Sequence, residues 1–359
     1  MKPFYYIANL IICLVLSGCT HRDQTTTISF IDQVSFSEFP VVVSLDSGTI
    51  LNTETIGNLQ FRIIDSLMVI ATAEMENSWK IRSIPKDSIL LEFISRGSGP
   101  DEFVSTPLIS QSSFFNSDGN LYVLISDNYR QRLRKINLSK SIKSGIMESN
   151  VENNSHINNF SVYSNLSDTN TQIFISVNPS EGSIKRTIIK DGAELSLHSI
   201  QHLNQYKVPK SDKLGLLMPN IISNYNKNRV VEVFELYPQI NIYSLDDKFS
   251  ITVMPEGKIG SYKQYIDSKS VENNDLIYMG GNSYNDFFVI NRINDLISEL
   301  WFFNWDGIPL LNIKLPELAT SFDIDFKNHT LYTLNFKNDI FKKYDLKDIL
   351  ESSVFLISN

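Results

Sequence analysis

Cysteine is almost absent from this chain. Its two cysteines, Cys13 and Cys19, both lie within the first twenty residues. The rest of the chain therefore offers no intramolecular disulfide, no cysteine metal ligand and no cysteine nucleophile. A chain of 359 residues can bury a core large enough to fold without such cross-links.

Runs of basic residues are also absent. The formal net charge is -8, and the lysines and arginines are scattered along the chain. Binding to nucleic acid depends on clustered positive charge that displaces counterions from phosphates, so nucleic acid is not an expected partner. Convincing helical periodicity is almost missing too, which points away from an α-helical fold.

One long apolar run is present, at the N-terminus. Lys2 precedes the apolar residues Tyr5 to Leu16, which are too few to span a bilayer and are typical of a cleaved signal peptide. The following residues, Leu16 to Cys19, resemble the signal-peptidase box of bacterial lipoproteins. The resemblance implies that residues 1–18 are removed and that Cys19 carries acyl chains that anchor the protein to the membrane. The alternative is an ordinary secretory signal followed by a chance cysteine.

The residues after Cys19 are polar and lack periodicity, as in Thr20 to Thr27. We expect residues 19–37 to be the lipidated cysteine and a flexible tether. The expected location is the cell envelope, with the chain anchored by lipid to the outer membrane.

Short strands dominate the remaining sequence. Residues Ser321 to Leu346 hold three runs in which large apolar residues alternate with polar ones. This period of two is a strand signal, and the intervening Asn- and Asp-containing segments 327–329 and 336–339 are typical of hairpin turns.

Similar strands recur upstream with a period of about fifty residues, near the length of a propeller blade. They begin near Leu67, Leu121, Ile173, Val230 and Asp286. Six such units predict an all-β fold, a six-bladed β-propeller formed as one domain by residues 38–359. The last unit is short of strands, and we expect Val41 to Leu45 to supply its outer strand. The alternative is a pair of β-sandwiches divided in the polar region Asn150 to Asn159.

Two motifs resemble a known family. Gly97-Ser98-Gly99-Pro100-Asp101-Glu102-Phe103 is similar to a Gly-x-Gly-Pro-x-Glu-Phe signature of six-bladed propeller lipoproteins of Bacteroidetes. Residues 300–309, with Trp305-Asp306-Gly307 at a tight turn, resemble a hairpin of the TolB-like propeller subgroup. The resemblance covers nearly the whole chain and implies a propeller fold and a location in the cell envelope. It implies little about activity, and the unit around Asn154 to Ile189 departs from the pattern.

The first of these motifs is open to two interpretations. Its glycines allow a close approach of the backbone, so the segment is a candidate for a connection between blades. In the second interpretation, Arg96 or Glu102 contacts a ligand.

No catalytic residue, cofactor or metal site is predicted. His198 and His202 are four residues apart, which would bring them together on a short helix within 193–208, but no third ligand stands nearby in the sequence. Asp323 and Asp325 lie two apart on one strand, and we expect a solvated strand face there.

Two functional hypotheses follow. The first is a lipid-anchored envelope protein whose propeller binds a protein, a peptide or a glycan; a purely structural partner in an outer-membrane assembly is a variant of it. The second is a propeller enzyme of the lactonase or glycan-lyase type, with a metal in the central channel. The enzyme would need Asp, Glu, Asn or His at equivalent innermost-strand positions of at least three blades.

Overall fold

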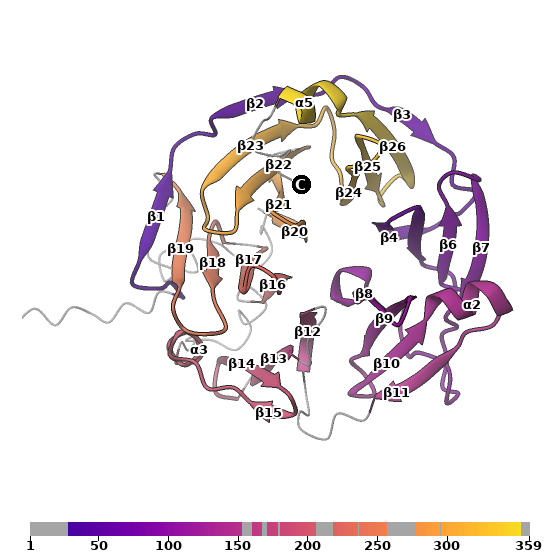
Figure 1. The fold of residues 1–359 in the computed structure, drawn as a ribbon, viewed down its shortest axis with the longest axis horizontal. Helices are drawn as coiled ribbons and strands as arrows, with labels where there is room; N and C mark the ends of the chain where they lie inside the picture. Colours follow the sequence, from indigo (N-terminus) through magenta and orange to yellow (C-terminus); the bar gives the residue numbers. More distant parts are fainter. Residues whose placement is uncertain are drawn as a thin grey trace, which may run out of the picture.

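A computed structural model describes residues 28–152, 160–166, 171–178, 180–205, 218–235, 237–256, 278–294 and 296–352. Six small sheets of four or five strands stand in a ring around a common axis (Figure 1). The expected signal peptide (residues 1–18) and lipidated Cys19 lie outside the described residues.

We number the blades in chain order from the first complete one. Blades 1 to 3 each contain four antiparallel strands. Their elements are, in blade 1, β4 (Asn58–Ile64), β5 (Leu67–Thr72), β6 (Trp79–Ser83) and β7 (Ser88–Phe93); in blade 2, the 3-10 helix η1 (Ile109–Gln111), β8 (Ser113–Ser117), β9 (Asn120–Asp127), β10 (Arg132–Asn137), α2 (Leu138–Ser144) and β11 (Ser149–Glu152); and in blade 3, β12 (Phe160–Leu166), β13 (Thr171–Asn178), β14 (Ser183–Lys190), β15 (Ala193–Glu194) and α3 (His198–Asn204).

Blades 4 and 5 each contain four consecutive antiparallel strands and a fifth strand from the N-terminal part of the chain, whereas blade 6 contains three consecutive strands and a fourth from that part. Their elements are, in blade 4, β16 (Pro219–Asn224), β17 (Arg229–Phe234), β18 (Ile240–Tyr243) and β19 (Ser250–Pro255); in blade 5, β20 (Tyr278–Ser283), β21 (Phe287–Asn294), β22 (Ile297–Asn304) and β23 (Pro309–Lys314); and in blade 6, β24 (Ser321–Asp325), β25 (Thr330–Asn335), β26 (Ile340–Asp345) and α5 (Lys347–Ser352).

This arrangement confirms the six-bladed β-propeller and shows that the β-sandwich alternative was wrong. The hairpin turns also lie where the sequence predicts them. His329 and Asp339 adopt positive φ in the two turns of blade 6, and Gly307 does so in the β22–β23 turn. Asn, Asp and His adopt this backbone conformation more readily than other residues with a side chain, and Gly adopts it without steric cost.

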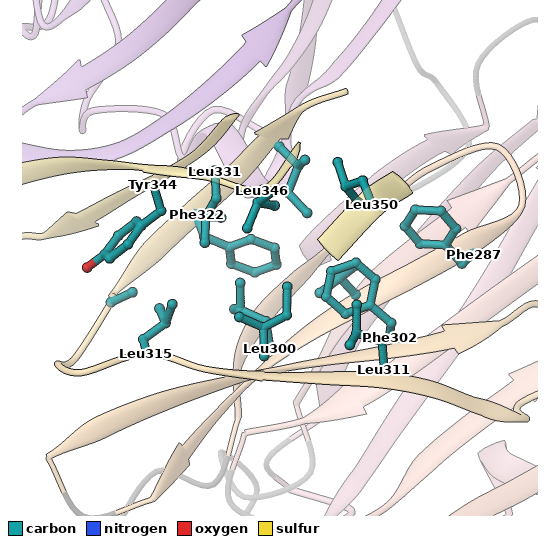
Figure 2. Close-up of a cluster of buried hydrophobic side chains, with 14 residues drawn as sticks. Phe287, Leu300, Phe302, Leu311, Leu315, Phe322, Leu331, Tyr344, Leu346 and Leu350 are labelled. Atoms are coloured by element: carbon teal, nitrogen blue, oxygen red, sulfur yellow. The ribbon is translucent and has the colours of Figure 1, made fainter. Parts of the chain in front are cut away.

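The core lies between the blades, because each sheet buries both of its faces against its neighbours. Figure 2 shows the cluster that joins blades 5 and 6, in which Phe302 and Leu311 of blade 5 share an interface with Phe322 and Leu331 of blade 6. Leu350 of α5 covers this cluster. A fully buried side chain of this size contributes roughly 1.5–3 kcal/mol, so these interfaces hold the ring together.

The N-terminal segment closes the ring as a strap along the rim of blades 4, 5 and 6 (Figure 1). Strand β1 (Gln33–Phe36) pairs in parallel with β19, β2 (Val41–Ser44) pairs in parallel with β23, and β3 (Thr49–Leu51) pairs antiparallel with β26. The prediction that Val41 to Leu45 completes the last blade was therefore wrong. These residues form a fifth strand of blade 5, and β3 completes blade 6. The reason is packing, because Val41 and Val43 lie against the cluster between blades 5 and 6.

The strap also begins earlier than expected. Ile28 and Phe30 are buried in the core beside blade 4, and the side chains of Gln239 and Asn241 both donate to the Ile28 carbonyl oxygen, at 2.6 and 2.8 Å. The boundary placed at residue 38 is therefore too late, because residues 28–36 belong to the fold and not to a flexible tether.

Candidate functional site

A blade of four consecutive antiparallel strands has two connections at each end of the propeller. Because the strands within a blade are antiparallel, the link between the second and third strands lies at the end where the innermost strand begins, and so does the link to the next blade. We call this end the loop face. Several connections at this face expose large apolar side chains, and these are Ile56, Met75, Val104, Leu108, Tyr129, Leu296 and Phe336.

A cavity of about 420 Å³ occupies the axis of the ring. Residues of the innermost strands of all six blades line it, and it reaches the loop face beside η1, Glu235 and Thr320. The polar residues of the lining are Gln60, Arg62, Ser110, Ser112, Ser113, Ser164, Asn220, Ser223, Glu235, Asn282, Ser283, Thr320 and Ser321.

Hydroxyl and amide groups dominate this polar lining. Near the loop face, Gln60 and Ser110 exchange hydrogen bonds, with Gln60 Nε2 3.3 Å from Ser110 Oγ and Ser110 N 3.2 Å from Gln60 Oε1. Farther along the axis, the hydroxyl of Ser283 donates to the Ser223 carbonyl oxygen at 2.8 Å, and Ser164 Oγ lies 3.5 Å from Ser223 Oγ. The cavity therefore offers neutral donors and acceptors contributed by several blades.

Two lining residues carry a charge. Glu235 is exposed at the loop face, where its carboxylate accepts a 3.0 Å hydrogen bond from Asn220. Arg62 lies toward the other end of the cavity. Its guanidinium extends from blade 1 past blade 6 to blade 5, where it donates to the Asn282 side-chain oxygen and, at 3.4 Å, to the Ser283 carbonyl oxygen.

Behind Arg62, the carboxylate of Asp323 connects three blades. It accepts hydrogen bonds from the Ile63 amide of blade 1 at 2.7 Å and from the Tyr284 hydroxyl of blade 5 at 2.8 Å. The Ile324 amide of its own strand donates a third, at 2.9 Å. Burial, followed by the charge of Asp323, raises the pKa of Tyr284 well above its usual value, so the phenol stays protonated and keeps donating.

The wall contributed by blade 5 is shaped by two glycines. Gly280 adopts φ +71° at an irregularity in the β20–β21 pairing, and a Cβ placed there would meet no atom within 4 Å. A Cβ on Gly281 would lie 2.4 Å from the Val289 carbonyl oxygen, so this position excludes any larger side chain. The backbone of β20 can therefore lie close to the axis without a side chain at these two positions that would fill the cavity.

The sequence-predicted residues Arg96 and Glu102 lie outside the axial cavity, in the connection between blades 1 and 2. Arg96 donates to the Ala73 carbonyl oxygen at 2.7 Å. Glu102 turns back on its own loop, where one carboxylate oxygen accepts a 2.6 Å hydrogen bond from the Gly99 amide. A Cβ on Gly97 would lie 2.1 Å from that carboxylate, which gives a physical reason for the first glycine of the motif.

Arginines from the neighbouring hairpin hold this loop from outside. Arg130 donates to the carbonyl oxygens of Gly99 and Glu102, at 2.9 and 2.6 Å, and Arg134 donates to that of Pro100. These contacts agree with the interpretation of the motif as a connection between blades. Ligand binding by Arg96 or Glu102 stays a prediction.

The other residues singled out in the sequence have structural partners. Asp323 and Asp325 are buried, so the expectation of a solvated strand face was wrong; neighbouring blades cover both faces of β24. His198 and His202 do lie on a helix, α3, where His202 Nε2 is 2.8 Å from the Ser29 carbonyl oxygen. Among the described residues, no group of three or more His, Cys, Asp or Glu side chains could hold a metal ion.

Sequence reasoning missed the residues that matter most in the cavity, including Arg62, Ser223 and Asn282. A signal was available, because small polar residues and glycines occur in the first strand of several units, as in PNIISN (β16) and YMGGNS (β20). Recognising it requires knowing which strand of each unit is innermost.

No protein-family model matches the sequence, and no curated protein matches it significantly. Solved structures similar to this chain include that of Raptor from Chaetomium thermophilum, with a TM-score of 0.45 and 11% sequence identity, covering 83% of this chain and 28% of that chain. The chain thus spans less than a third of that protein's length. No helix among the described residues is long and apolar enough to cross a membrane.

Proposed function

We propose that this protein is a binding module of the bacterial cell envelope whose axial cavity takes the end of a glycan. One observation carries the proposal: the cavity is lined by hydroxyl and amide groups from several blades and reaches the loop face. Sugars present many hydroxyls that both donate and accept, and serine, asparagine and glutamine side chains match them.

The size and the apolar part of the lining agree with a sugar ligand. Small-molecule sites usually have volumes of about 300–1,000 Å³, and this cavity of about 420 Å³ falls in that range. Phe114, Ile221 and Met279 line the cavity, are partly exposed, and contribute apolar surface between the polar groups. Such surfaces pack against the C–H faces of a sugar ring, and the exposed Tyr129 and Phe336 at the loop face would contact further units of the chain.

The envelope location depends on the N-terminal sequence. We propose that cleavage after Gly18 leaves Cys19 lipidated, and that the protein belongs with the TolB-like six-bladed lipoproteins of Bacteroidetes that its motifs resemble. Firm anchoring needs more than one acyl chain. In the native bacterium, we expect the protein in the outer-membrane fraction and labelled by a fatty-acid analogue. Replacement of Cys19 by Ser should abolish both, and an unlabelled, soluble wild-type protein would contradict the anchor.

Binding is tested on the mature chain that begins at residue 19 and carries Cys19→Ser, which keeps every described residue. We expect a glycan array to yield binders and these to raise the melting temperature of the protein. Ser110→Trp, which places a bulky ring on η1 at the mouth of the cavity, should reduce that binding at least tenfold. Lys86→Trp, in an exposed turn of blade 1 at the opposite end, is the matched control. Glycan binding that Ser110→Trp leaves unchanged, or binding of peptides alone, would contradict the proposal.

A further inference from the structure

We infer that the axial cavity selects a sugar that carries a carboxylate, such as a hexuronate, and that Arg62 binds this carboxylate. The inference rests on the proposed function, because it concerns the ligand of the same cavity. Three observations support it: the contacts that position the Arg62 guanidinium, the hydrogen bonds that Asp323 accepts from other residues, and the charged side chains that line the cavity.

The guanidinium of Arg62 is partly open to the cavity. Its side chain is 26% exposed, although it lies near the middle of an innermost strand and its partner Asp323 is only 2% exposed. Nη1 of the guanidinium donates to the Asn282 side-chain oxygen. Asn282 is itself fixed, because its amide nitrogen donates to the Phe322 carbonyl oxygen at 2.6 Å. The guanidinium is therefore positioned on the wall of the cavity before any ligand arrives.

Asp323 does not depend on Arg62 for its hydrogen bonds. Its two oxygens already accept from Ile63 N, Ile324 N and Tyr284 Oη, at 2.7 to 2.9 Å. The contact between Arg62 Nε and Asp323 Oδ2 is longer, at 3.4 Å, and so is the contact between Arg62 and the Ser283 carbonyl oxygen. Arg62 can therefore turn these donors to a ligand while Asp323 keeps its three other hydrogen bonds.

The chemistry of a guanidinium favours a carboxylate over a neutral hydroxyl. Its planar set of donors matches the two oxygens of a carboxylate, and charge-assisted hydrogen bonds are roughly twice as strong as neutral ones. Arg62 is the single cation among the described residues of the lining. The carboxylate of Glu235, which would repel an acidic sugar, is exposed at the loop face and accepts a hydrogen bond from Asn220. Serine and amide groups around Arg62 would then bind the hydroxyls of the same sugar.

Calorimetric titration of the mature Cys19→Ser chain compares galacturonate with galactose and glucuronate with glucose. We expect at least one acid to bind about tenfold or more tightly than its neutral counterpart. Arg62→Gln should remove that preference and change the affinity for the neutral sugar less than threefold. Arg229→Gln is the matched control, since Arg229 is also half-buried and paired with a carboxylate, that of Asp306, but lies outside the cavity.

A second variant keeps the test valid if Arg62→Gln does not fold. Asn282→Asp places a carboxylate beside the guanidinium of Arg62. This carboxylate would compete with that of the sugar, so the preference for the acid should disappear. Equal binding of acid and neutral sugars by the parent chain would overturn this inference and leave the proposed function standing. Failure of the parent chain to bind any glycan or sugar would overturn both.

Discussion

The hydroxyl of Tyr284, on blade 5, donates a 2.8 Å hydrogen bond to the carboxylate of Asp323, on blade 6. The same carboxylate accepts from the backbone of Ile63 on blade 1. One side chain thus joins three consecutive blades next to the axial cavity. This is also the region where the ring closes, since the strap strand β3 of blade 6 leads directly into blade 1.

Replacing Asp323 by Ala should therefore destabilise the protein more than the removal of such a small side chain would suggest. The change leaves the Ile63 and Ile324 amides and the Tyr284 hydroxyl without their acceptor, and a buried polar group without a partner costs about 1–3 kcal/mol. We expect a loss of about 2–5 kcal/mol in the free energy of unfolding, measured by urea denaturation. Asp306→Ala, which breaks the exposed pair with Arg229, should cost below about 1 kcal/mol. Equal losses in the two variants would contradict this role of Asp323.

The raised pKa of Tyr284 predicts that stability falls at alkaline pH. The folded protein keeps the phenolic proton at pH values where the unfolded chain loses it, so unfolding releases a proton and becomes easier as pH rises. The loss should begin above the ordinary tyrosine pKa of about 10, with a slope of up to about 1.4 kcal/mol per pH unit for this group. Urea denaturation between pH 8 and 11 measures it. Tyr284→Phe should show a shallower decline, and an unchanged slope would contradict the assignment.

Arg186 and Glu232 form a buried ion pair between blades 3 and 4. Two hydrogen bonds of 2.7 and 2.9 Å join them, and both side chains are at most 2% exposed. Removing one partner leaves a buried charge without compensation, so Glu232→Ala should cost about 3–5 kcal/mol. The double variant Arg186→Met, Glu232→Leu replaces both charges by apolar groups and should be more stable than Glu232→Ala alone. Denaturant midpoints compare the two, and a less stable double variant would disprove the prediction.

The Gly-x-Gly-Pro-x-Glu loop allows a double-mutant cycle. Gly97→Ala should displace the Glu102 carboxylate, and Glu102→Ala removes it, so each change breaks the same contact with the Gly99 amide. We expect each single variant to lose about 1 kcal/mol and the double variant to lose about the same. The exposed Ser98→Ala is the control. Additive losses would show that Gly97 and Glu102 act independently.

The sequence by itself determined that the chain forms short strands joined by tight turns and that these strands group into six units. The blade 6 meander, with positive φ at His329 and Asp339, follows from alternation of period two and from residues that suit tight turns. These are local effects, because they depend on neighbours within a few residues. The repeat of about fifty residues then indicated a ring of blades, since one meander cannot bury both of its faces.

Only the tertiary structure decided which polar residues are buried and which face the axis. Alternation assigns side chains to two faces of a strand, but in a propeller the neighbouring blades cover both faces. For this reason Asp323 is buried although it was expected in water. The partners of Arg62 come from residues more than 200 positions away in the chain, and the strap strand β2 joins blade 5 through parallel pairing over a similar separation. Contacts of that range depend on how the ring closes, and no local sequence pattern encodes them.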